Sequence, residues 1–437
     1  MRRRDIDVPF SSSHIRSKVA TIQAMATYPL LSEAALQGKR VLVRVDHNIE
    51  LGPDGKLKND KKILATLPTI TLLLQKGARV ILMTHVGRPK GKADPLLSTK
   101  PASEHLKTLL PDVSIAHITS TVGSDVEKEV KKLRGGDILY LENVRFHKEE
   151  EGELDEQAAF GKQLASLADV YVNEAFASCH DYEEASTCAV ARLLPGFAGL
   201  NLQKEIDMLS PVLKDPRRPL TLIISGAKME TKIPVVEYFL SSGDDILLGG
   251  AIANTFIAAR GFDVGTSTYE ADQVEKAQEL MLESEKEDRA KIHVPRDGVV
   301  ASLPAGRQVL PTEDAPKLDL PVEDIGGDMC IFDIGKVTVE RYIAEIERAG
   351  MIVWNGPLGL YELNRFSHGT KRIAEAVAAA TRRGAVTIVG GGDTIDFHAR
   401  YGFDLGAYTF VSTGGGAMLE FISGKPFPAL QALATKA

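Results

Sequence analysis

Residues 386–393 read Val-Thr-Ile-Val-Gly-Gly-Gly-Asp, an apolar run that ends in three glycines and a carboxylate. The same rhythm returns along the chain, where short apolar runs end in Gly or polar residues and alternate with longer helix-like segments. This alternation is typical of parallel βαβ units, in which each buried strand is followed by a crossover helix. It predicts an α/β fold, with strands over residues 41–45, 80–83, 138–141, 170–172, 220–224, 246–248, 351–353, 386–389 and 408–411.

The residues that follow the expected strands differ between the two halves of the chain. In the first half they carry charge, as in Asp46-His47-Asn48, whereas in the second half they are rich in glycine, as in Gly249-Gly250-Ala251. Ligands of open parallel sheets bind beyond the carboxyl ends of the strands. We therefore expect the first half to bind a small, multiply charged anion. Glycines in the second half favour a bulky phosphorylated ligand, because the backbone can approach it closely.

Length and composition limit the classes of protein to consider. A chain of 437 residues exceeds what one hydrophobic core usually serves, which predicts two domains. The net charge of −7 argues against a nucleic-acid partner, and no apolar run approaches the roughly 20 residues that span a bilayer. The three cysteines form no CxxC pair, which fits reduced thiols in a cytoplasmic protein. We expect a monomer that acts on small molecules, without a nucleic-acid or membrane partner.

Two further segments bear on the organisation of the chain. The helix-like stretch 200–213 precedes a Pro- and Arg-rich turn and is expected to join the two domains. The segment 302–323 is rich in Pro and charge, and we expect a surface loop there.

Several motifs together carry a resemblance to a known family. The phrases are Arg44-Val45-Asp46-His47-Asn48, Leu67-Pro68-Thr69-Ile70, His85-Val86-Gly87-Arg88-Pro89, Leu141-Glu142-Asn143-Val144-Arg145-Phe146, Gly226-Ala227-Lys228, Trp354-Asn355-Gly356-Pro357, Gly390-Gly391-Gly392-Asp393-Thr394 and Ser412-Thr413-Gly414-Gly415-Gly416. In this order, and with family-like spacing from about Leu31 to the end, they make the chain resemble phosphoglycerate kinase.

The resemblance implies a fold and an activity. The fold would be two Rossmann-like, three-layer lobes with parallel sheets, joined by a hinge helix. Residues 23–199 would bind 3-phosphoglycerate, residues 200–410 would bind the nucleotide, and residues 411–437 would pack back on the first lobe. Residues 1–22 are expected to be a disordered extension. The activity would be reversible phosphoryl transfer between 1,3-bisphosphoglycerate and ADP, giving 3-phosphoglycerate and ATP, with Mg²⁺.

The resemblance also assigns residues to the two ligands. The positions that match the acid-binding motif are Arg44, Asp46, Asn48, Lys62, His85, Arg88 and Arg145. The positions that match the nucleotide-binding motifs are Gly226, Ala227, Lys228, Lys232, Gly249, Gly250, Asn355, Glu362, Gly390, Gly391, Gly392, Asp393 and Thr394. Asp393 looks like the Mg²⁺ contact. The catalytic set would be Lys62, Lys228, Gly391 and Gly414, which would neutralise charge on the transferring phosphoryl group.

Physical arguments bear on four of these residues. If Gly226 opens a helix, Lys228 and Lys232 fall on one face near its positive end; a solvated helix face is the alternative. Asp393 follows a strand and can reach a hard cation, although it can also cap the next helix. His85 can equally be a satisfied, buried histidine. The sequence contains no obvious catalytic base, and an ionised acceptor carboxylate needs none.

Three positions depart from the family pattern on the acid side. Lys62 replaces an arginine and so loses a planar fork of donors, and His47 replaces a phenylalanine. The stretch after Phe176 is one residue longer and places Asp181 where an arginine would bind phosphate. Two alternatives to an active phosphoglycerate kinase therefore remain: a nucleotide-binding relative whose damaged acid site has lost catalysis, and a kinase for a different small carboxylate.

Overall fold

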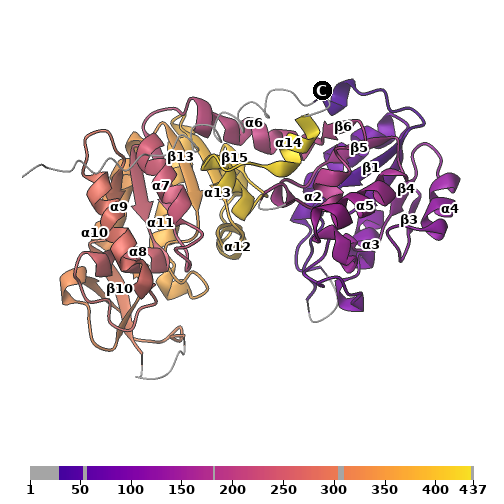
Figure 1. Cartoon of the computed structure of the whole chain (residues 1–437). Helices are drawn as coiled ribbons and strands as arrows, with labels where there is room; N and C mark the ends of the chain where they lie inside the picture. Colours follow the sequence, from indigo (N-terminus) through magenta and orange to yellow (C-terminus); the bar gives the residue numbers. More distant parts are fainter. Residues whose placement is uncertain (1–28, 53–56, 181–182, 304–309, 435–437) are drawn as a thin grey trace, which may run out of the picture. The chain divides into compact units, whose positions relative to one another are not determined.

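The computed structural model describes residues 29–52, 57–180, 183–303 and 310–434 (Figure 1). The predicted extension over residues 1–22 lies outside these ranges. By its contacts the chain divides into two compact units, Met1–Ser210 with Gly424–Ala437, and Pro211–Ser423. None of the described helices has the length and apolar character needed to cross a membrane.

A parallel six-stranded sheet forms the centre of the first unit, in the order β3-β4-β2-β1-β5-β6. Val41 and Val43 pack in one core cluster with residues of α2 and α3, while Leu42 between them is equally buried. Because successive strand residues point to opposite faces, both faces of the sheet are covered. The elements of this sheet and its helices are β1 (Arg40–Arg44), β2 (Arg79–Met83), β3 (Ile115–His117), β4 (Ile138–Tyr140), β5 (Val170–Asn173), β6 (Gly196–Ala198), α2 (Lys61–Gln75), α3 (Lys100–Leu109), α4 (Ser124–Lys132) and α5 (Leu154–Ala165).

The second unit repeats this plan around a parallel six-stranded sheet in the order β15-β14-β13-β7-β8-β9. Ile352 and Trp354 pack with α10, α11 and α12, whereas Val353 is buried on the other face. The elements are β7 (Leu220–Ile224), β8 (Asp245–Leu248), β9 (Lys291–His293), β13 (Met351–Asn355), β14 (Val386–Gly390), β15 (Phe410–Val411), α7 (Ile233–Ser242), α8 (Gly250–Ala259), α9 (Val274–Ser284), α10 (Lys336–Arg348), α11 (His368–Arg382), α12 (Gly392–Tyr401) and α13 (Gly416–Ile422).

Two helices lie where the chain passes between the units. Helix α6 (Leu200–Lys214) contains the boundary between Ser210 and Pro211. Helix α14 (Pro428–Ala434), yellow in Figure 1, contacts β6 and the short π-helical turn η6 (Ala185–Ala189) of the first unit. By contrast, β15 pairs with β14 and α13 contacts α7, both in the second unit. The chain therefore returns to the first unit at Gly424, later than the predicted residue 411.

The predicted α/β class with parallel sheets is confirmed, whereas some edge elements were not predicted. The sequence did not predict the outer strands β3, β6 and β9, because these three-residue strands are too short to form an apolar run. The expectation of a loop over 302–323 is wrong in part, because β11 (Leu318–Pro321) pairs antiparallel with β10 (Asp297–Ser302). β11 is a largely exposed edge strand that ends in proline, so its sequence carries no run of buried residues. A third strand, β12 (Met329–Ile334), completes this small sheet.

Candidate functional site

The first cavity, of about 850 Å³, lies in the first unit, and its lining includes residues that follow β1, β2, β4 and β5. Its position is the one expected for a ligand site of a parallel sheet, beyond the carboxyl ends of the strands. Six of the seven residues predicted to bind the acid line it: Asp46, Asn48, Lys62, His85, Arg88 and Arg145. The seventh, Arg44, does not.

Arg44 is the last residue of β1, and its side chain is fully buried beneath this cavity's wall. Its Nε donates to Ser186 Oγ at 2.8 Å and its Nη1 donates to the Val45 carbonyl at 2.8 Å. Its Nη2 lies 2.8 Å from Nδ1 of His85. Burial, and then the positive charge of Arg44, lower the pKa of His85 well below its ordinary value, so His85 is neutral and can accept this hydrogen bond.

Lys62, in the first turn of α2, forms an ion pair with Asp46, whose Oδ2 lies 2.9 Å from the ammonium nitrogen. Asn48 is also partly engaged, since its Oδ1 accepts a hydrogen bond from the Gly87 backbone at 2.9 Å. Arg88 is exposed, and no described side chain pairs with its guanidinium. This rim of the cavity thus offers one unpaired arginine and one lysine that is already paired.

Two acidic residues that the sequence did not assign to the site lie among its arginines. Glu184 Oε1 accepts from Arg145 Nη2 at 2.7 Å, and Glu184 Oε2 lies 3.4 Å from Arg44 Nη2. Glu150 is fully buried and accepts from Ser186 N and Oγ. Burial, and then the charge of Glu184, raise the pKa of Glu150 to about 8. The signal in the sequence for Glu184 was the acidic character of the lengthened loop after Phe176.

The departures from the family pattern fall in different surroundings. His47 is fully buried and does not line the cavity. Its ring nitrogens lie 2.7 Å from Tyr140 Oη and 2.8 Å from Thr66 Oγ1, and burial lowers its pKa to about 3. His47 is therefore a neutral core residue with satisfied hydrogen bonds. Asp181 lies outside the described residues.

The second cavity, of about 310 Å³, lies in the second unit and is lined by some of the residues predicted to bind the nucleotide. Its lining includes Gly226, Ala227, Gly250, Glu362 and Asp393. Glu362 and Asp393 are exposed, and no described cation forms an ion pair with either carboxylate. The cavity therefore combines glycine backbone with two unpaired negative charges.

Helix N-termini follow two inner strands of the six-stranded sheet of this unit, β8 and β14. Gly249 and Gly391 are the N-cap residues of α8 and α12, directly after β8 and β14. Gly391 has a φ of 98°, and a Cβ at this position would lie 2.9 Å from Asn355 Nδ2, so the turn requires glycine. Backbone N–H groups at such ends attract phosphates.

Gly226 does not open a helix, so the condition under which Lys228 and Lys232 would share a helix face is not met. Helix α7 begins at Ile233, with Lys232 as its N-cap. Met229 is buried and its N–H donates to Glu270 Oε1 at 3.0 Å, which fixes the preceding segment as a loop. Lys232 donates to Asn355 Oδ1 at 3.0 Å, and burial lowers its pKa against the opposing charge of Asp393.

Lys228 lies in that loop, is exposed and has no described partner for its ammonium group. Two other predicted residues are used within the fold: Thr394 Oγ1 accepts from Gly356 N at 2.8 Å, and Gly414 N donates to Ser412 Oγ at 3.1 Å. Gly390 ends β14 and Gly392 begins α12. None of these five residues lines the second cavity.

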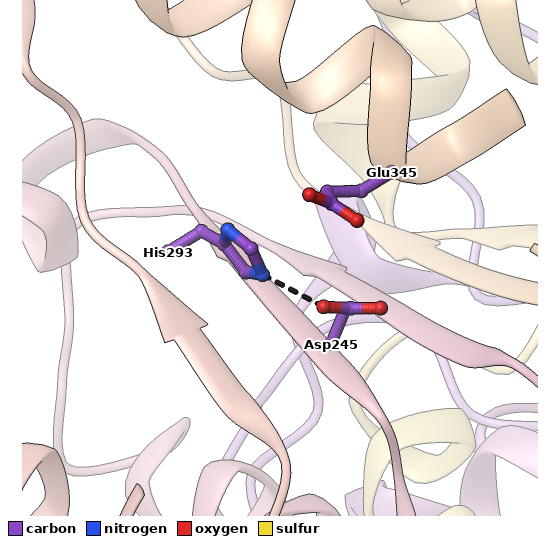
Figure 2. Close-up of side chains that lie close together, drawn as sticks. All are labelled: Asp245, His293 and Glu345. Atoms are coloured by element: carbon purple, nitrogen blue, oxygen red, sulfur yellow. Dashed lines mark hydrogen bonds and ion pairs between the residues drawn. The ribbon is translucent and has the colours of Figure 1, made fainter. Parts of the chain in front are cut away.

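One group of metal-ligand type lies apart from both cavities. Figure 2 shows Asp245 of β8, His293 of β9 and Glu345 of α10, whose ligand atoms lie within 4.8 Å of one another. His293 Nε2 lies 2.7 Å from Asp245 Oδ1, and Glu345 pairs with Arg348. Because each member already has a partner, we assign this group to the packing of α10 on the sheet.

Sequence comparisons relate almost the whole chain to one family. The family model described as phosphoglycerate kinase matches residues 31–425. The phosphoglycerate kinase of Moorella thermoacetica is 44% identical over 406 residues, which cover 93% of this chain and 99% of the relative. That of Chloroflexus aurantiacus is 43% identical over 397 residues, covering 91% and 96%. Among solved structures, phosphoglycerate kinase from Coxiella burnetii matches with a TM-score of 0.80 and 34% identity, covering 94% of this chain and 100% of that one.

Proposed function

The chain belongs to the phosphoglycerate kinase family and is a phosphotransferase acting between 1,3-bisphosphoglycerate and ADP; we propose that its first unit binds the acid and its second unit binds the Mg-nucleotide. The observation that carries this assignment is the difference between the two cavities. The first is lined by Arg88, Arg145, Lys62 and His85, whereas the second is lined largely by glycine and apolar residues.

A basic cavity suits 3-phosphoglycerate, which carries a phosphate and a carboxylate. Arg88 has no described partner, so its guanidinium can form two parallel hydrogen bonds with phosphate oxygens. Asn48 lies at the same rim and is suited to bind the hydroxyl of 3-phosphoglycerate. Asp46 also lies there and is suited to orient Lys62, with which it forms an ion pair. The predicted role of Arg44 requires a rearrangement of its neighbours, because the side chain is fully covered.

The second cavity suits a nucleotide whose phosphates meet backbone N–H groups at the starts of α8 and α12. Asp393 fits a Mg²⁺ held mainly by phosphates, because its carboxylate is exposed and no described cation pairs with it. Asp393 belongs to no cluster of described ligands, so the protein would supply only part of the coordination. When bound, Mg²⁺ neutralises charge on the phosphates. Glu362, at the cavity wall, is suited to the ribose hydroxyls.

The chemistry needs positioning and charge neutralisation and no general base. The carboxylate of 3-phosphoglycerate attacks the γ-phosphorus, a carboxyl–phosphate bond forms, and the bond to the departing ADP oxygen breaks. The carboxylate is already ionised near neutral pH. Lys228 lies on a loop, and no described residue pairs with its ammonium group. It is therefore suited to neutralise the negative charge of the phosphoryl group during transfer. Backbone N–H groups near Gly391 and Gly414 would share that task.

We also propose that the protein acts as a cytoplasmic monomer on small molecules. Cys179, Cys188 and Cys330 are free and buried, as is usual where disulfides do not form.

The assignment of ligands to units is tested by replacing Arg88 with Ala. Loss of a hydrogen bond between charged groups should raise the KM for 3-phosphoglycerate by about tenfold or more. The KM for ATP should stay within about twofold. Lys92→Ala removes a nearby exposed charge that does not line the cavity and should change neither value. An equal rise in both KM values for Arg88→Ala would contradict separate binding surfaces.

A further inference from the structure

The carboxylate of Glu184 lies between the guanidinium groups of Arg145 and Arg44, at 2.7 and 3.4 Å. Its side chain is only 4% exposed, and those of Arg145 and Arg44 are 11% and 0% exposed. Two converging arginines are a typical binding arrangement for an anionic ligand group. Here a carboxylate of the chain itself takes that place.

The contact of Glu184 with the two arginines also separates Arg44 from the first cavity. Three of its N–H groups are directed to Ser186, to the Val45 carbonyl and to His85, and Nη2 also approaches Glu184. Glu184 and Arg145 line the first cavity, but Arg44 does not. A ligand in the cavity therefore meets Glu184 before it can meet Arg44, and it meets Arg145 only in competition with the same carboxylate.

We propose that Glu184 is an internal counter-ion that the acid substrate replaces when it binds, so that Glu184 sets the affinity of the chain for that substrate. The inference rests on the proposed function, in that the acid binds in the first cavity. The N–H groups of Arg145 that hold Glu184 are not available to a second anion at the same time. The apparent Kd for the acid then equals the intrinsic Kd divided by the fraction of molecules in which Glu184 has left the arginines.

The neighbouring groups allow this exchange. Charged or titratable residues that interact with Glu184 include Arg44, Arg145, Glu150 and Cys179, and His85 lines the same cavity. Glu150 is buried beside Arg44, and the charge of Glu184 helps to raise its pKa. When Glu184 leaves, ionisation of Glu150 becomes easier and Arg44 keeps a negative partner. The adjacent Glu183 is tied elsewhere, to Arg192 at the surface.

The test is calorimetric titration of 3-phosphoglycerate into wild type and Glu184→Gln. The amide keeps the size of the side chain and removes the charge, so the Kd should fall by about tenfold or more, the worth of one hydrogen bond between charged groups. The Kd for ADP should not change. Glu183→Gln is the matched control and should match wild type for both ligands. An unchanged or larger Kd for the acid in Glu184→Gln, with an unchanged Tm, would overturn the proposal.

Glu184→Asp keeps the proposal testable if the amide variant does not fold. Its side chain is shorter by one methylene and cannot keep both arginine contacts, so the Kd for the acid should again fall, by a smaller factor. An acid Kd equal to that of wild type in Glu184→Asp would also overturn the proposal. If neither wild type nor the variants bind 3-phosphoglycerate while all bind ADP, the proposed function of the first cavity fails as well. If all bind it equally, only the role of Glu184 fails.

Discussion

The ammonium nitrogen of Lys62 lies 2.9 Å from Oδ2 of Asp46, at the rim of the first cavity. A lysine in this contact has few donors left for a ligand, whereas an arginine presents five donors in a fixed fork. Lys62→Arg should therefore keep the ion pair and lower the KM for 3-phosphoglycerate by about three- to tenfold. Steady-state kinetics check this, with Lys61→Arg, an exposed neighbour, as the control. An unchanged KM would mean that residue 62 does not meet the ligand.

Lys228→Ala should lower kcat by about 10²-fold or more while the Kd for ADP changes by less than about threefold. The reason is that an exposed, unpaired ammonium on a loop acts where charge develops during transfer. Single-turnover kinetics and nucleotide titration measure the two effects separately. Lys336→Ala removes another exposed lysine of the second unit and should leave both values unchanged. A change confined to Kd would assign Lys228 to binding alone.

Asp393→Asn should raise the Mg²⁺ concentration needed for half-maximal activity by about tenfold and lower kcat at saturating Mg²⁺. A neutral amide oxygen is a weaker ligand for a hard cation than a carboxylate. Titration of activity with Mg²⁺ at fixed ATP provides the readout. Asp396→Asn, one turn further along α12, removes a carboxylate charge that accepts a hydrogen bond from Tyr361, and it should leave the Mg²⁺ requirement as in wild type. Equal Mg²⁺ curves for wild type and Asp393→Asn would exclude Asp393 as a ligand.

Glu174 predicts a pH dependence of stability. It is buried beside the start of α6, and burial raises its pKa from 4.5 to about 7 despite hydrogen bonds from Thr69, Asn201 and Leu202. The folded state then holds a proton that the unfolded state loses, so Glu174 lowers stability as pH rises from about 4.5 to about 7.

Glu174→Gln has no such proton. Relative to wild type, the variant should gain about 3 kcal/mol in unfolding free energy between pH 4.5 and 7.5. Urea unfolding at both pH values measures the difference. A constant difference across this range would show that the pKa of Glu174 is the same in the folded and unfolded states.

The sequence predicted the strands whose residues are buried on both faces, because such strands read as continuous apolar runs. It missed β11, whose side chains are largely exposed. It also left open a helix that would carry Lys228 and Lys232 on one face, because their spacing fits one, and no such helix forms. The loop there depends on a long-range contact of Met229 with Glu270, which no local pattern reveals. The pairing of Glu184 with Arg44, 140 residues away along the chain, was beyond reach for the same reason.

The central claim is that this chain transfers a phosphoryl group between an acyl phosphate held by its first unit and a nucleotide held by its second. The most direct measurement is ATP formation from 1,3-bisphosphoglycerate and ADP, followed by a coupled assay with Mg²⁺ and then with EDTA. We predict a turnover number of about 1 to 10³ s⁻¹, the usual range for enzymes, that disappears when the chelator removes Mg²⁺. Tight ADP binding without ATP formation from 1,3-bisphosphoglycerate would contradict the account.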